Sequence, residues 1–173
     1  YNMQELKQEM LRAGEQFQTT SDTEVILAGY LRYGQDFVKK LNGIFAFAIW
    51  DERLEKLFLF RDRVGIKPLF YRIQDKTLIF ASEIKGILQY PGVKAQVDRE
   101  GLCEVFGLGP AKTYGKGVFK DIHEVLPGHI LEYGKDTCRE YAYWKLESKP
   151  HLDSFKQTVE KTEYLVVDAV RKQ

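Results

Sequence analysis

The feature that constrains the fold most is a series of short aromatic and β-branched runs between residues 44 and 82. Four runs, separated by charged or Gly- and Pro-containing turns, read IFAFAIW, KLFLF, LFYRI and TLIFA. Runs of this length and composition are typical of strands, so the sequence predicts a four-stranded antiparallel meander. The first run, residues 44–50, is apolar at nearly every position. Because a strand with one wet face alternates, we expect helices to cover one face of this strand and a second sheet the other.

Helical patterns precede the strands. A first helix is predicted to end at Gly14, and a second to run from Asp22 to Tyr33. Ser21 and Glu24 fit a capping box, in which the serine accepts the amide proton of the third residue and the glutamate reaches back to the serine. The pattern at 37–41 predicts one more short helical turn.

The second half of the chain alternates short helices with one hairpin. In order, the sequence predicts a short helix at 83–90, a helix at 98–106 capped by Asp98, an exposed loop at 107–117, a closing hairpin at 128–146 and an amphipathic helix at 152–173. The pattern as a whole predicts an α+β fold.

Composition narrows the function classes. The chain has 173 residues, 44% of them hydrophobic, and a net charge of +1. This charge gives no reason to expect nucleic acid or an anionic membrane as a partner. No apolar run approaches the roughly 20 residues of a spanning helix. Two separated cysteines and three scattered histidines give no metal-ligand spacing, and we expect reduced thiols and a cytoplasmic location.

Five segments carry a resemblance to a known family: 21–34 (SDTEVILAGYLRYG), 41–51 (LNGIFAFAIWD), 59–71 (LFRDRVGIKPLFY), 80–88 (FASEIKGIL) and 124–133 (EVLPGHILEY). In order and spacing they resemble the amidotransferase domain of glutamine-hydrolysing asparagine synthetases. The resemblance implies an N-terminal-nucleophile hydrolase fold of four layers, two antiparallel sheets packed between helices. The chain is expected to hold this fold without its N-terminal part.

The resemblance also implies a reaction. In the family, an N-terminal cysteine attacks the side-chain amide of glutamine and releases ammonia, with its own α-amino group as the base. Tyr1 and Asn2 match the residues that follow an NGE segment of the oxyanion hole. We therefore expect no catalytic residue within this chain and no activity from the chain alone. ATP and magnesium are expected in a C-terminal synthetase domain, because no phosphate-binding loop occurs before Gln173.

The same resemblance sets the expected domains and partners. Residues 1–146 are expected to form the amidotransferase domain, and 147–173 a linker and the first helix of the synthetase domain. Glutamine and that synthetase domain are the expected partners, with a homodimer as a further option. Two alternatives stay open: a non-catalytic scaffold with an amidotransferase-like fold, and a relative of the β-lactam synthetase type.

Asp22 is the one predicted site residue. It matches the family position whose carboxylate holds the α-amino group of glutamine, where opposite charges form a charge-assisted hydrogen bond. The competing interpretation is that Asp22 only places a negative charge in the first turn of a helix. Both roles are compatible with each other.

Other chemically reactive residues have structural interpretations. Cys103 is expected to be a small core residue, and Cys138 the same or mildly exposed. The charges of Arg61, Asp62, Arg63 and Lys67 are expected to shape a tight turn, with contact to a neighbouring domain as the functional alternative. Glu83 could orient a site residue or stabilise the start of a helix. The histidines are expected to be turn or surface residues: His123, His129 and His151.

Overall fold

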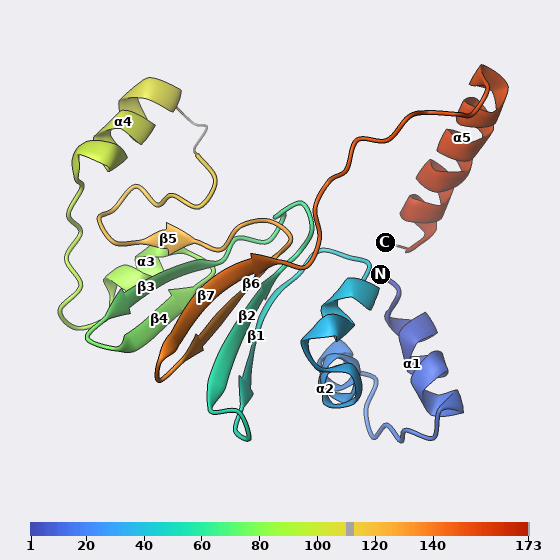
Figure 1. Cartoon of the computed structure of the whole chain (residues 1–173), viewed down its shortest axis with the longest axis horizontal. Coiled ribbons are helices and arrows are strands. Elements are labelled where there is room, and N and C mark those ends of the chain that lie inside the picture. Colours follow the sequence, from blue (N-terminus) through green and yellow to red (C-terminus); the bar gives the residue numbers. More distant parts are fainter. Residues whose placement is uncertain (110–112, 173) are drawn as a thin grey trace. The chain divides into compact units, whose positions relative to one another are not determined.

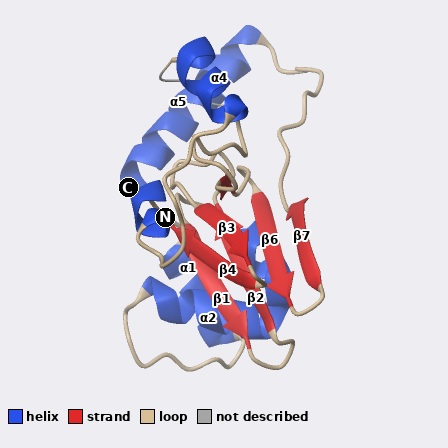
Figure 2. Cartoon of the chain, turned by 90° about the vertical axis from the view of Figure 1, so that its left-hand side faces the viewer, coloured by secondary structure: helices blue, strands red, loops and turns tan. Residues whose placement is uncertain are grey.

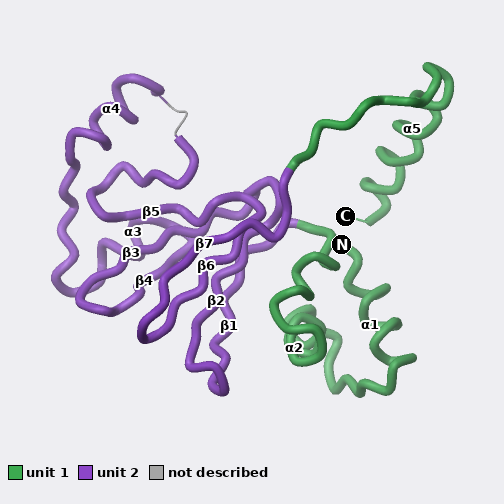
Figure 3. The backbone as a smooth tube through the Cα atoms, viewed as in Figure 1, with its two compact units in different colours: residues 1–43, 146–173 green, residues 44–145 purple. Residues whose placement is uncertain are grey.

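The structure is a computed structural model that describes residues 1–109 and 113–172. The chain divides into two compact units, one made of residues 1–43 and 146–173 and the other of residues 44–145 (Figure 3). Each unit is described by itself below. Among the described residues, no helix is both long enough and apolar enough to cross a membrane.

The elements follow one another along the chain as Figure 1 shows. The helices are α1 (Met3–Arg12), α2 (Asp22–Tyr33), the 3-10 helix η1 (Gly34–Lys40), α3 (Ile84–Leu88), α4 (Arg99–Leu108) and α5 (Phe155–Lys172). The strands are β1 (Ala46–Asp51), β2 (Lys56–Arg61), β3 (Phe70–Gln74), β4 (Thr77–Ala81), β5 (His123–Glu124), β6 (His129–Gly134) and β7 (Thr137–Ala142).

The strands of the second unit form two antiparallel sheets. One sheet has the order β1-β2-β6-β7 and the other β4-β3-β5. Figure 2 draws the strands in red. The predicted closing hairpin is confirmed as β6–β7, although β7 ends at Ala142. The predicted four-stranded meander is wrong, because β1 and β2 lie in one sheet and β3 and β4 in the other.

The link between β2 and β3 explains this difference. It runs from residue 62 to residue 69, longer than the roughly two to five residues of an ordinary hairpin loop. Asp62 and Pro68 lie in this link, and the chain crosses from one sheet to the other there. Each aromatic run was predicted correctly as a strand, but run composition does not specify which strand pairs with which.

The core lies between the two sheets. The fully buried cluster of Leu59, Leu69, Val125 and Leu131 combines residues of β2, of β6 and of the segments that flank β3 and β5. A second cluster, centred on Phe70, Ile87 and Ile122, packs α3 against the opposite face of the three-stranded sheet. The second unit therefore contains two stacked sheets and one helical cover.

Strand β1 differs from its prediction. Both of its faces were expected to be covered, yet the Trp50 side chain is 59% exposed and Ala48 is exposed as well. β1 is the end strand of its sheet within the described part of the chain. Ala48 and Trp50 point to the same face as the buried Leu59, because side chains alternate along a strand and Ala48 pairs with Leu59. The part of this sheet face to which Ala48 and Trp50 contribute is therefore exposed to solvent.

The first unit begins with helices α1 and α2. Leu6, Met10 and Val25 are buried in it. A side chain at Gly29 would collide with the ring of Phe37, since a Cβ there would lie 2.2 Å from a ring carbon. The predicted bounds of α2 are confirmed, and the helix ends at Gly34, whose φ of 63° suits glycine. The predicted short turn at 37–41 is part of η1.

The later helices lie where the sequence predicts them, but their lengths differ from the prediction. Asp98 caps α4 as predicted, and its Oδ1 accepts a hydrogen bond of 2.9 Å from the Gly101 amide. The loop predicted at 107–117 begins later, because α4 continues to Leu108; residues 110–112 of that loop lie outside the described residues. Helix α5 has no buried residue among those described.

Candidate functional site

The predicted site residue, Asp22, is the first residue of α2 and is exposed. Ser21 precedes it in extended conformation, and the Ser21 hydroxyl accepts a hydrogen bond of 3.2 Å from the Thr23 amide. This cap fixes the start of the helix and therefore the backbone position of Asp22. The helix dipole also favours a negative charge at this end.

Glu24 does not complete the predicted capping box. Its carboxylate accepts hydrogen bonds of 2.8 Å from the amides of Gln18 and Thr19 and one of 2.6 Å from the Thr19 hydroxyl. The prediction that Glu24 reaches back to Ser21 is therefore wrong. The physical reason is that the preceding loop turns its own amides toward the helix start and supplies a closer set of donors.

These hydrogen bonds also favour the charged form of the Glu24 carboxylate. Hydrogen bonds from Gln18 and Thr19 hold the pKa of the Glu24 carboxyl below its usual value. The same loop is tied to α1, because Lys7 Nζ donates a hydrogen bond of 2.6 Å to the Thr19 carbonyl and lies 5.1 Å from the centre of the Phe17 ring. The loop that precedes Asp22 is thus held from both sides.

The second motif singled out in the sequence, Arg61 to Lys67, forms a built turn. Asp62 is fully buried, and its carboxylate accepts hydrogen bonds from the amides of Ile66 at 3.0 Å, Lys67 at 2.9 Å and Phe45 at 3.4 Å. A buried carboxylate that accepts several amide protons stabilises the loop around it. The structural interpretation of this motif is therefore confirmed for Asp62.

Arg61 joins that turn to the rest of the unit. Its guanidinium donates hydrogen bonds to the carbonyls of Lys67, Gly65 and Val125, and it forms an ion pair of 2.9 Å with the buried Glu124. The buried charge of Arg61 is therefore satisfied on several sides. Sequence reasoning missed the partner Glu124, because nothing local connects residues 61 and 124.

The buried acids Glu124 and Glu132 were not recognised as structural groups in the sequence. Besides Glu124, Glu132 of β6 is 1% exposed and lies between Lys56 Nζ at 2.6 Å and the Arg139 guanidinium at 2.7 Å. Burial opposes the charge of Glu132, but the hydrogen bonds from Lys56 and Arg139 outweigh it and hold the pKa of this carboxyl below its usual value. The alternation along β6 and β7 could have indicated this cross-strand group.

Both cysteines are exposed free thiols. The prediction that Cys103 belongs to the core is therefore wrong: α4 buries only Gly101, which lies against the Val118 carbonyl, and leaves its other positions less covered. Cys138 agrees with the mildly exposed alternative. Partial burial and the charge of Glu140 raise the pKa of the Cys138 thiol, which opposes the thiolate that a nucleophile needs.

The remaining candidates have local partners. Glu83 precedes α3, forms an ion pair with Lys85 and gives the helix no side-chain cap. His129 Nδ1 lies 2.7 Å from the Pro127 carbonyl, and His151 Nε2 lies 2.7 Å from the Thr158 hydroxyl. His123 is exposed on β5. The prediction of turn and surface histidines is confirmed, and the described residues hold no group of three or more potential metal ligands.

The stacked antiparallel sheets define a fold class. The chain is similar to the structure of the glutamine phosphoribosylpyrophosphate amidotransferase from Bacillus subtilis, with a TM-score of 0.57 and 23% identity, over 83% of this chain and 27% of that one. The predicted α+β class and N-terminal-nucleophile hydrolase architecture are confirmed by this likeness of fold.

Sequence comparison then identifies the family. The family model described as "Glutamine amidotransferase domain" matches residues 1–144, and the chain belongs to this family. It is 50% identical over all of its length to glutamine-hydrolyzing asparagine synthetase 3 of Bacillus subtilis and spans 28% of that relative. It is 37% identical over 99% of its length to a putative glutamine-hydrolyzing asparagine synthetase 2 of Methanocaldococcus jannaschii, of which it spans 33%. The chain thus spans about a third or less of these relatives.

Proposed function

We propose that this chain is the glutamine-hydrolysing part of an asparagine synthetase and supplies ammonia for the ATP-dependent conversion of aspartate to asparagine. The observation that carries the proposal is the 50% identity, along the whole chain, to a relative named glutamine-hydrolyzing asparagine synthetase. Membership of the glutamine amidotransferase domain family supports glutamine as the nitrogen donor. The scaffold and β-lactam synthetase alternatives have no observation in their favour.

Within this function, Asp22 binds the α-ammonium group of glutamine. Its carboxylate is exposed at the start of a capped helix, and the loop before it is held by Glu24 and Lys7. An exposed carboxylate on a held backbone segment can form a charge-assisted hydrogen bond with an ammonium group. The nucleophile is expected outside this chain, so the chain alone releases no ammonia from glutamine.

The proposal assigns residues 1–146 to the amidotransferase domain and 147–173 to a linker and the first helix of a synthetase domain. The family match ends at residue 144, before α5. Helix α5 carries exposed apolar side chains on one face, with Phe155 85%, Val159 48% and Val166 58% exposed. Such a face is typical of a helix that packs against further protein. ATP and magnesium belong to that synthetase domain.

The test uses the complete enzyme from which the chain derives and compares two nitrogen donors. Replacing Asp22 with Ala is expected to raise the KM for glutamine by about tenfold or more, the equivalent of a lost charge-assisted bond, and to leave ammonia-dependent asparagine synthesis unchanged. The matched control is Asp36→Ala, which removes an exposed carboxylate from η1 that only pairs with Lys39. Equal loss of both activities in the Asp22 variant would refute the binding role.

A further inference from the structure

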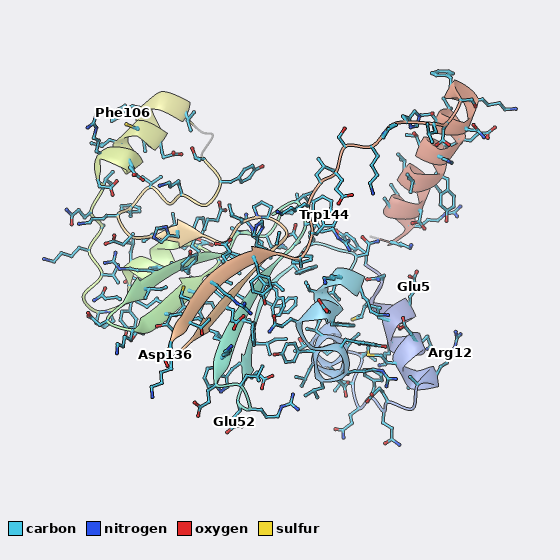
Figure 4. All side chains as sticks on the ribbon, in the orientation of Figure 1. Glu5, Arg12, Glu52, Phe106, Asp136 and Trp144 are labelled. Atoms are coloured by element: carbon cyan, nitrogen blue, oxygen red, sulfur yellow. The ribbon has the colours of Figure 1, made fainter. Side chains whose placement is uncertain are left out.

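The loop between α1 and α2 is closed by hydrogen bonds that meet at the half-buried Glu24. Figure 4 labels Arg12, the last residue of α1, after which this loop begins. The two oxygens of Glu24 have different partners. Oε1 accepts the Gln18 amide at 2.8 Å, and Oε2 accepts the Thr19 amide at 2.8 Å and the Thr19 hydroxyl at 2.6 Å. A charged carboxylate only accepts hydrogen bonds, so each of the three donors directs its proton at Glu24.

The Thr19 hydroxyl connects Glu24 to the residue before Asp22. Because the hydroxyl proton is donated to Glu24, the lone pairs of the oxygen are available, and the oxygen accepts a hydrogen bond of 3.2 Å from the Ser21 amide. The Ser21 hydroxyl in turn accepts the bond from the Thr23 amide that caps α2. The bonded series is therefore Glu24, Thr19, Ser21 and Thr23. Asp22 lies between the last two of them in the sequence, so the series restrains the backbone on both sides of its carboxylate.

Polar bonds rather than apolar packing hold this loop. Among residues 16–21, Phe17 is half-buried and the others are exposed. From α1, Lys7 Nζ donates a hydrogen bond of 2.6 Å to the Thr19 carbonyl and lies 5.1 Å from the centre of the Phe17 ring. A segment with so few buried apolar contacts opens locally at low cost. The bonds from Glu24 and Lys7 therefore decide how well the loop is ordered.

We infer that Glu24 and Thr19 are positioning residues for glutamine, a role that rests on the proposed binding of the glutamine ammonium group by Asp22. They act through the backbone and need no contact with glutamine themselves. When they are present, the Asp22 carboxylate projects from an ordered segment. When either is lost, glutamine binding must also order the loop, and that cost lowers the affinity for glutamine.

Steady-state kinetics of the complete enzyme, with glutamine and with ammonia as alternative nitrogen donors, test the inference. Glu24→Gln keeps the shape of the side chain but turns an NH2 group toward one of its amide donors. Thr19→Val keeps the branched shape but removes the hydroxyl that joins Glu24 to Ser21. Each variant is expected to raise the KM for glutamine about three- to tenfold, to change kcat by less than about twofold, and to leave ammonia-dependent synthesis unchanged.

Glu9→Gln is the matched control, because it makes the same chemical change in the same unit. The Glu9 carboxylate forms an ion pair of 2.7 Å with Lys40 and so joins α1 to η1 rather than to the loop. Its KM for glutamine is expected to equal that of the parent. Hydrogen exchange of a peptide that spans residues 16–21 should be faster than in the parent in both loop variants and unchanged in the control.

The outcomes separate this inference from the function on which it rests. A parent enzyme that makes no asparagine from glutamine would refute the proposed function, and the positioning role with it. In a parent that uses glutamine, three results overturn the positioning role alone: an unchanged KM in either loop variant, an equal loss with both nitrogen donors, or an equal rise of KM in Glu9→Gln.

Discussion

Removal of the Asp62 carboxylate gives the sharpest test of how the link between the sheets is held. Asp62 is fully buried and accepts hydrogen bonds from three backbone amides, those of Ile66, Lys67 and Phe45. Asp62→Ala leaves these donors without their acceptor in a place that water does not reach. At about 1 to 1.5 kcal/mol for each lost bond, with the longest bond counted least, the expected loss is about 3 to 4 kcal/mol.

That loss is large against the total stability of a domain of this size, about 5 to 15 kcal/mol. Urea unfolding followed by circular dichroism measures it, with an unchanged m-value showing that the unfolding reaction is the same. Asp62→Asn keeps one oxygen acceptor and should lose about 1 to 2 kcal/mol. Asp136→Ala, in the exposed turn between β6 and β7, should change stability by less than about 0.5 kcal/mol. An Asp62→Ala chain within about 1 kcal/mol of the parent would refute the argument.

Two other carboxylates make testable predictions. Because the pKa of Glu24 is lowered in the folded state, its bonds are present above its unfolded pKa near about 4.3 and are lost as the pH falls through the folded value. Hydrogen exchange of the Gln18 and Thr19 amides should therefore be slowed at neutral pH in the parent and fast in Glu24→Gln; equal rates in both chains would contradict this. The pKa of Glu132 is also lowered in the folded state, so its ion pairs stabilise the fold at neutral pH and are lost in acid. Glu132→Gln should therefore lower the urea midpoint at pH 7, and the difference between variant and parent should shrink below about pH 4. A difference that is constant with pH would show that the ion pairs do not matter.

The sequence predicts helices well where a local signal exists. Ser21 and Gly34 mark the two ends of α2, and Asp98 marks the start of α4; each acts through bonds to residues a few positions away. The strands of the four aromatic runs and of the closing hairpin were located because their composition is local too, whereas the two-residue strand β5 was not predicted. The pairing of β2 with β6, by contrast, joins residues 56–60 to 130–134 and depends on contacts that no local pattern contains.

The residues of the candidate site also separate into those that a local pattern predicts and those that only the fold brings together. The charges of the Arg61–Lys67 turn were assigned a structural role correctly, because Gly65 and Pro68 in the same segment indicate a turn. The partner Glu124 could not be predicted, since it reaches Arg61 only through the fold. Cys103 was placed wrongly because residue type was the only evidence for its burial, and α4 leaves that position exposed.

The two acids in the first turn of α2 have different environments. Asp22 and Glu24 contribute similar charges to the helix start. From the sequence, Asp22 was predicted to bind an ammonium group, with the helix dipole as the competing interpretation, and Glu24 was assigned to a capping box. In the structure Glu24 turns back to the amides of Gln18 and Thr19, where its charge is used to fold the loop. The carboxylate of Asp22 remains exposed at the same end of the helix. Under the proposed function, the accessible carboxylate of Asp22 is the one that can meet an ammonium group, because the carboxylate of Glu24 is already occupied by the amides of the preceding loop.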